Sequence, residues 1–334
     1  MSQTVFGRLH AVYEEVRLLS VRRGARVEFY YMGKGMFASF LQYLGEGVFV
    51  WMTVADLPRK QRGVESRFVE KVDKIMLPHG ATPKVFFDAN LIKSGIRTLV
   101  NSRKPKLFID FEMSMPPFKY NPDFLSELIQ CGMILADDAG NVIEQHSTFI
   151  KPFMFPEITD RTRKFLKITQ SSINDGVEFP DFHGLLDQIV TQYRPMIVVW
   201  GQNDIIELRK AALYHRLPDI TRKAQFVDLL KLHKNYFGLK NDVGLFNAYK
   251  VYAAVDPEKQ AHDALEDATV TKLVFDGFKK VCNGDSDIVF KNPEPIPAKS
   301  AEADPAETPA VAATAGTPAE SAAPAPAMTP VVGL

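Results

Sequence analysis

Leu-Phe-Ile-Asp-Phe-Glu-Met, residues 107–113, is the stretch that decides the fold, because it is a β-prone apolar run interrupted by two acids. Side chains alternate along a strand, so Asp110 and Glu112 project from one face and Ile109 and Phe111 from the other. Burying two neighbouring carboxylates is costly without a compensating positive charge, which a hard divalent cation would supply. The alternative is an ordinary solvated acidic pair, since Asp-x-Glu alone is common on protein surfaces.

The composition is that of a soluble protein with ample apolar content for a packed core. The 334 residues carry 40 basic and 40 acidic side chains, but residues 1–105 hold 17 Lys and Arg against 9 Asp and Glu. This local excess favours an anionic partner, with chance asymmetry as the alternative. Without a signal peptide or a membrane-spanning run, Cys131 and Cys282 indicate reduced thiols in a cytoplasmic protein that has no membrane contact.

Residues 1–100 are expected to form a separate small basic domain, either α+β or barrel-like. Apolar residues at helical spacing predict a helix from about Phe6 to Val21. Short β-prone runs bounded by glycines predict the strands that follow. These strands are Val27–Tyr31, Met36–Leu44, Val48–Val54 and Asp73–Leu77. A helix over Asp88–Ser102 would connect this domain to the next.

Aromatic and basic residues alternate within residues 1–100, a mixture that suits stacking on single-stranded nucleic acid. The aromatic residues are Phe29, Tyr30, Tyr31, Phe37, Phe40 and Tyr43, and the basic ones are Arg22, Arg23, Arg26 and Lys34. One alternative is that these rings form the core of the domain. Another is that the domain mediates formation of a homodimer.

Residues 106–285 are expected to form an α/β domain with a mixed five-stranded sheet flanked by helices. The 107–113 strand is followed by a predicted helix near Asp123–Leu128 and two strands, Ile129–Asp137 and Val142–Ile150, joined by a turn. A further strand is predicted over Met196–Trp200, and Gln225–Leu230 is predicted to be a last strand or a strand-to-helix junction. Helices are predicted over Thr159–Lys167, Phe182–Tyr193, Asn203–Tyr214, Val243–Tyr252 and His262–Val281. A meander followed by strand–helix alternation implies helices on both faces of the sheet. The Ala/Pro-rich tail, residues 293–334, is expected to be disordered.

Three residues later in the chain are candidates to form a site together with Asp110 and Glu112. Asp204 follows a buried strand and begins a helix, at the sheet edge where α/β proteins place ligands, although a helix-capping aspartate is the common alternative. His262 begins the last helix, with Asp267 one and a half turns further on, so one helix end could present both to a cleft. A histidine in such a place is more often structural.

The order Asp110-x-Glu112, then Asp204 after Trp-Gly-x-x, then His262-x4-Asp267 resembles the DEDDh family of 3'–5' exonucleases, in the superfamily of RNase T and proofreading exonucleases. Phe-Ile-Asp-Phe-Glu-Met-Ser-Met-Pro and Val-Val-Trp-Gly-x-x-Asp are most like the bacterial KapD-like branch, which is related to the ERI-type exoribonucleases. The resemblance covers about residues 106–282, and residues 1–100 lie outside it.

The resemblance implies an RNase H-like fold and a site for two Mg²⁺ or Mn²⁺ ions. The implied metal ligands are Asp110, Glu112, Asp204 and Asp267. His262 would be the general base, for which an unperturbed pKa near 6.5 suits neutral pH. Of the neighbouring acids, Asp263 is interpreted as a helix cap and Glu266 as facing away from the site.

The resemblance also implies hydrolysis of single-stranded RNA or DNA from the 3' end, releasing nucleoside 5'-monophosphates, with RNA slightly favoured. Met113 and Ser114, directly after the metal-binding strand, and Asn203 are candidates to contact the terminal nucleotide. The alternative function is that of a non-catalytic regulatory protein that uses the exonuclease fold to bind nucleic acid or protein.

Overall fold

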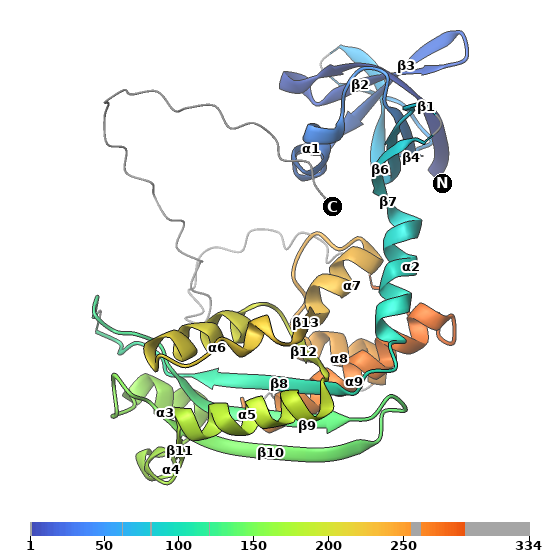
Figure 1. The fold of residues 1–334 in the computed structure, drawn as a ribbon. Coiled ribbons are helices and arrows are strands. Elements are labelled where there is room, and N and C mark those ends of the chain that lie inside the picture. The colour runs from blue at the N-terminus through green and yellow to red at the C-terminus, as the bar shows by residue number, and fades with distance from the viewer. Residues whose placement is uncertain (1, 62, 81, 120, 255–261, 291–334) are drawn as a thin grey trace, which may run out of the picture. The chain divides into compact units, whose positions relative to one another are not determined.

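The computed structural model describes residues 2–61, 63–80, 82–119, 121–254 and 262–290 (Figure 1). These residues contain two β-sheets, which helix α2 (Ala89–Val100) joins along the chain. The predicted disorder of residues 293–334 concerns a segment outside the described residues. Within the described part of the chain, no helix is both long and apolar enough to cross a bilayer.

The first sheet closes into a small barrel. Its strands are β1 (Ser2–Tyr13), β2 (Leu18–Arg23), β3 (Arg26–Met32), β4 (Phe49–Ala55), β5 (Arg59–Gln61), β6 (Val64–Leu77) and β7 (Lys84–Asp88). The main order is β3-β2-β1-β4-β6, and a parallel pairing between β3 and β6 closes the ring. Helix α1 (Lys34–Phe40) adds Phe37 to the apolar core inside this barrel. The chain thus has the small β-rich N-terminal part that the sequence predicts.

The predicted helix from Phe6 to Val21 is wrong, because this segment forms β1, a short 3-10 turn and β2. Val5 and Leu9 face the core by simple alternation, and a register shift between Leu9 and Ala11 then changes the phase of that alternation. Such a shift places apolar residues three or four positions apart, which imitates helical spacing in the sequence.

Two further local predictions are wrong. The expected strand over Met36–Leu44 is helix α1 followed by a 3-10 turn, since a short apolar run does not distinguish the two. The expected helix near Asp123–Leu128 is irregular. There the Glu127 N–H donates to Ser114 Oγ, and the Glu127 carboxylate accepts backbone N–H groups from residues 153–155. Bonds between segments so far apart in the chain override local propensity.

The second sheet is mixed and has the order β11-β10-β9-β8-β12-β13. Its strands are β8 (Lys106–Met113), β9 (Leu128–Ala136), β10 (Val142–Lys151), β11 (Val177–Glu178), β12 (Met196–Val199) and β13 (Gln225–Asp228). Strands β8, β9 and β10 form an antiparallel meander, while β12 runs parallel to β8 and to β13. The predicted mixed five-stranded sheet is confirmed, and the two-residue β11 extends it at one edge.

Helices cover both faces of this second sheet (Figure 1). One face packs on α2, α7 (Leu229–Phe237), α8 (Leu245–Ala253) and α9 (Ala264–Asn283), and the other on α5 (Phe179–Tyr193) and α6 (Asn203–Tyr214). Two short helices, α3 (Asp160–Leu166) and α4 (Gln170–Asn174), precede α5. On β8, Phe108 belongs to the first core and Leu107 to the second, so this strand is buried on both sides.

A neutral histidine lies inside the core on the α9 side. His233 on α7 is fully buried, its Nδ1 lies 3.1 Å from the Leu229 carbonyl oxygen, and its Nε2 lies 2.7 Å from the Tyr252 hydroxyl. Nδ1 therefore carries the proton and donates to the carbonyl, while Nε2 accepts from tyrosine. Burial lowers the pKa of His233 to about 4.

Acidification is expected to destabilise the protein through His233. Its pKa is lower in the folded than in the unfolded chain, so its contribution is complete above pH 6.5 and is lost as the pH falls toward 4. The loss should amount to ~3 kcal/mol of unfolding free energy. The measurement compares wild type with His233→Gln between pH 7 and 4 in EDTA, where all other titrating groups are shared. Parallel stability curves for the two proteins would contradict the prediction.

Candidate active site

Strand β8 presents Asp110 and Glu112 on the face of the sheet that α9 covers. Phe108 shares this face and packs edge-on against Phe275 of α9, with ring centroids 5.4 Å apart. Ile109 and Phe111 point the other way, into the core formed with α5 and α6. The alternation that the sequence predicts for this strand is therefore the one that the structure has.

The backbone of α9 lies directly against β9 at Gly132. A Cβ atom on this glycine would lie 2.1 Å from the Ala264 carbonyl oxygen and 2.3 Å from the Leu265 nitrogen. Since Gly132 is the cross-strand partner of Asp110, this contact lays the first turn of α9 beside the carboxylates of β8. A side chain at position 132 would hold the helix away from them.

Asp263 fixes the start of α9. Its Oδ1 accepts hydrogen bonds from the N–H groups of Leu265 and Glu266, both at 3.1 Å, and its Oδ2 accepts one from Gln130 Nε2 at 2.8 Å. Such a side chain satisfies N–H groups that have no partner within the helix. Asp263 is thus the helix cap that the sequence indicates, and Glu266 is exposed.

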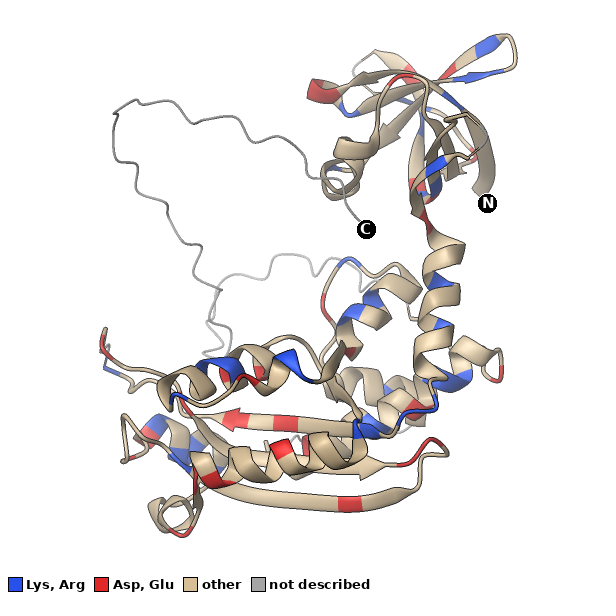
Figure 2. Ribbon diagram, in the orientation of Figure 1, with Lys and Arg blue, Asp and Glu red and all other residues tan. Residues whose placement is uncertain are grey.

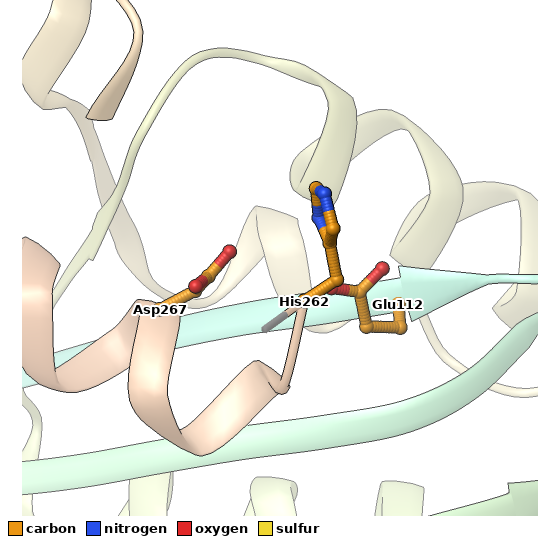
Figure 3. A group of neighbouring side chains, drawn as sticks. All are labelled: Glu112, His262 and Asp267. Atoms are coloured by element: carbon orange, nitrogen blue, oxygen red, sulfur yellow. The ribbon is translucent and has the colours of Figure 1, made fainter. Parts of the chain in front are cut away.

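Glu112, His262 and Asp267 come together at this helix start (Figure 3). Each offers one ligand atom, and these atoms all lie within 4.8 Å of one another. His262 has a φ of 54°, in the left-handed region that few residues other than glycine adopt, and its ring lies 4.2 Å from the ring of Phe165 on α3. The strained backbone and this aromatic neighbour turn the imidazole toward the two acids.

Asp204, in the first turn of α6, lies against the same strand. It is 6% exposed, and its Oδ1 accepts a hydrogen bond from the N–H of Phe111 at 3.1 Å. Phe111 stands between Asp110 and Glu112, so this bond places the Asp204 carboxylate next to both. The carboxyl end of β12 thus delivers an acid to β8, as parallel strands in α/β sheets commonly do.

Burial and mutual repulsion both oppose the ionisation of the acids at this site. Burial raises the pKa of Asp110 well above its ordinary value, and the charges of Asp204, Asp267 and Glu112 raise it further. Burial likewise raises the pKa of Glu112 to about 8, with Asp267 as the next cause, and that of Asp204 to about 7. A cluster of carboxylates in this state requires protons or cations to compensate its charge.

The donor set fits a hard divalent cation. Carboxylate oxygens are the ligands that Mg²⁺ and Mn²⁺ prefer, and the carboxylates of Glu112, Asp204 and Asp267 lie close enough to Asp110 to raise its pKa. Asp267 is 5% exposed, whereas Glu112 is half-buried and reaches solvent. The residues present therefore suit a catalytic metal site.

The three predicted substrate contacts differ in their surroundings. Met113 packs against the core shared with α5 and α6. Ser114 is 4% exposed, and its hydroxyl accepts from the Glu127 N–H at 3.0 Å. Asn203 is exposed at the first residue of α6. A role in substrate binding stays a prediction for all three.

Three residues of the site region do not stand out in the sequence: Gly132, Gln130 and Phe165. Each acts through a neighbour far away in the chain, so no local pattern identifies it. A glycine inside an apolar strand is the one available signal, since it often marks a close backbone approach.

Replacing Asp263 by Ala is expected to loosen the start of α9. The loss of the cap should lower stability by about 1 kcal/mol, and kcat should fall because His262 and Asp267 flank the cap. Asp263→Asn is the matched control, since asparagine caps nearly as well, and it should keep both properties close to wild type. Thermal midpoints and kcat of the two variants test this, and equal losses in both would contradict a capping role.

Comparisons with known proteins agree on one class. The model of the RNase T exonuclease family matches residues 107–275. The probable 3'–5' exonuclease KapD of Bacillus subtilis (strain 168) is 34% identical over 170 residues, which are 51% of this chain and 82% of that protein.

Solved structures are more distant. The nuclease domain of 3'hExo, a DEDDh family member bound to rAMP, has a TM-score of 0.47 and 16% identity over 54% of this chain and 94% of that one. E. coli exonuclease I with a 5cy-dT13 oligonucleotide has a TM-score of 0.42 and 18% identity over 54% of this chain and 41% of that one.

The RNase H-like sheet and its acidic site define a hydrolase that acts on nucleic acids. The chain belongs to the RNase T family of exonucleases, and the KapD exonuclease is its homologue. Residues 1–106 lie outside the family match.

Proposed function

We propose that this protein is a metal-dependent 3'–5' exonuclease that releases nucleoside 5'-monophosphates from single-stranded nucleic acid. The observation that carries the proposal is the meeting of acids from β8, α6 and α9 beside one imidazole. The proposed ligands of two Mg²⁺ or Mn²⁺ ions are Asp110, Glu112, Asp204 and Asp267. Bound there, such ions supply an activated water and charge stabilisation for the leaving 3' oxygen.

His262 is the proposed general base. Burial and the nearby charge of Lys167 lower its pKa, so the ring is neutral at neutral pH and can accept a proton from the attacking water. Its contact with Phe165 holds the ring in place. Asn203 and Met113 adjoin the ligands Asp204 and Glu112 in the chain and are proposed to contact the terminal nucleotide.

RNA is the proposed preferred substrate. The support is the resemblance of the β8 segment and of the segment ending at Asp204 to exoribonucleases. Metal ions bind the phosphate backbone and the 3' terminus of the substrate, not its bases, so broad tolerance of base sequence is expected. Discrimination against DNA would require contacts with the 2'-hydroxyl group.

The test uses 5'-labelled single-stranded RNA and DNA of the same sequence, incubated with Mg²⁺, Mn²⁺ or EDTA. We expect a ladder of products shortened from the 3' end with either metal, none with EDTA, and faster degradation of RNA. A matched substrate with a blocked 3' end should resist degradation. Internal cleavage of that blocked substrate, or activity in EDTA, would overturn the proposal.

A reducing, cytoplasmic environment is proposed for the protein. Cys131 and Cys282 are both free and buried. Free thiols persist where glutathione and thioredoxin keep cysteines reduced. Fractionation of the source cells, followed by detection of the protein, tests this.

A further inference from the structure

Three aromatic rings lie together on the outer surface of the barrel. Phe6 of β1 stacks on Phe49 of β4 with centroids 5.5 Å apart, and its ring is tilted against that of Trp51 at 4.4 Å. Phe6 is 47% exposed, although the barrel core is filled by the residues on the inward side of the same strands. The Lys74 ammonium lies 5.8 Å from the centre of the Trp51 ring.

A second set of rings, each at least partly exposed, lies on the outer side of β1, β3 and β6. Tyr13 pairs with Phe29 at 6.2 Å, and Tyr31 pairs with Phe68 at 6.0 Å. Tyr13 and Phe68 are 44% and 40% exposed. The Arg17 guanidinium lies 5.4 Å from the Tyr31 ring centre, so the second set also carries a cation.

Two arginines connect the two sets of rings. In the registers of the barrel, Phe49 lies opposite Arg8, Arg8 opposite Arg22, and Arg22 opposite Val27, which precedes Phe29 on the same face of β3. Like charges directly opposite each other destabilise a sheet. Among the described residues, no acid forms an ion pair with either arginine. Figure 2 shows further basic residues along the β2–β3 hairpin.

We propose that this continuous outer surface, from Trp51 across Arg8 and Arg22 to Phe68, binds single-stranded nucleic acid. The rings offer stacking faces to successive bases, and the paired arginines offer their charge to the phosphates between them. The proposal rests on the proposed function, because a strand held on the barrel belongs to the substrate class of the nuclease site. It assigns to residues 1–88 a function that the family match at 107–275 does not reach.

The chemistry of the surface favours nucleic acid over a second copy of the chain. A dimer formed through two copies of this surface would place arginines against arginines around any two-fold axis that passes through it. An extended polyanion with aromatic bases suits both the two arginines and the partly exposed rings. A closed five-stranded barrel is also a common frame for oligonucleotide binding.

The test measures binding of a fluorescein-labelled 20-nucleotide single strand to the full chain in EDTA, which removes metal-dependent contacts. Arg8→Gln/Arg22→Gln should weaken binding about tenfold and reduce the slope of log K against log salt by about 1.4. Phe6→Ala and Phe68→Ala should each weaken binding about fivefold or more, with the salt slope unchanged. All four substituted side chains are at least partly exposed, so the fold should be retained.

The controls lie on the same barrel. Arg59→Gln/Lys60→Gln removes two exposed charges on β5, and Leu57→Ala shortens a side chain that is 77% exposed. Both should bind like wild type. An arginine variant that loses no more affinity than the β5 control would overturn the proposal. So would a change in sedimentation mass without a change in affinity, since the surface would then be a dimer contact.

A short substrate separates this inference from the proposed function. Hydrolysis of thymidine 5'-p-nitrophenyl phosphate with Mn²⁺ reports on the nuclease site alone, and all barrel variants should match wild type. Failure of wild type to cleave it would contradict the proposed function, whatever the binding results. Weakened binding in the arginine variant with unchanged cleavage of the short substrate would support the barrel surface specifically.

Discussion

Replacing Asp110 by Asn is expected to abolish exonuclease activity and, at the same time, to stabilise the metal-free protein. Activity should fall by about 10³-fold or more, because a central metal ligand is lost. The metal-free midpoint should rise by a few degrees, since Asp204, Asp267 and Glu112 no longer face a fourth acid. Opposite changes in activity and stability are the signature of a charge retained for function.

Metal titration makes this prediction sharper. At 100 times the dissociation constant, an ion that binds only the folded state stabilises it by about 2.7 kcal/mol. Wild type should show this rise in thermal midpoint with Mn²⁺, whereas Asp110→Asn should show little of it. Asp138→Asn, on an exposed turn, is the matched control and should behave as wild type in all three measurements. An Asp110→Asn protein that keeps its exonuclease activity would contradict the role of Asp110 as a metal ligand. Cellular function that survives the loss of this activity would favour the binding-protein alternative.

Gly132→Ala is expected to be severely destabilising and nearly inactive, although it adds only a methyl group. The new Cβ would lie 2.1 Å from the Ala264 carbonyl oxygen, and backbone cannot yield as the end of a flexible side chain can. We expect a loss of about 3 kcal/mol in stability. Moving α9 away would also carry His262 and Asp267 out of reach of Glu112. Denaturant unfolding and kcat on labelled RNA measure the two effects.

Gly95→Ala is the matched control. Gly95 lies inside α2, and a Cβ there would meet no atom within 4 Å. Alanine should raise stability by about 0.5–1 kcal/mol, because glycine is a poor helix former. If Gly132→Ala were as stable as wild type, the close approach of α9 to β9 would not exist in solution.

The sequence predicts much of the second sheet because its signals are local. Alternation within one strand is enough to predict that Asp110 and Glu112 share a face. The apolar run at 196–199 likewise predicts a buried central strand before Asp204. The helices over residues 160–166 and 203–214 begin and end close to where their patterns place them. These elements carry enough periodicity to be recognised without knowledge of their neighbours.

The remaining features depend on contacts between distant segments. The register shift after Leu9 gives two strands an apolar spacing that resembles that of a helix. The Glu127 carboxylate holds an irregular segment in place by accepting hydrogen bonds from the backbone of residues 153–155. The contact at Gly132 and the Gln130–Asp263 bond each join β9 to a helix more than 130 positions away. The division of the chain into domains at residues 100 and 106 stays a prediction.

Helix α2 makes the nuclease part of this chain inseparable from sequence that its family match does not include. Ile96 and Val100 are buried in the same core as Phe108 and Phe275, while Asp88, which caps α2, pairs with Lys74 of β6 at 2.9 Å. A shortened protein that started at residue 106 would expose the apolar surface of α9 that α2 covers, and we expect it to aggregate. A fusion of the nuclease part to a different protein therefore has to include residues 89–100.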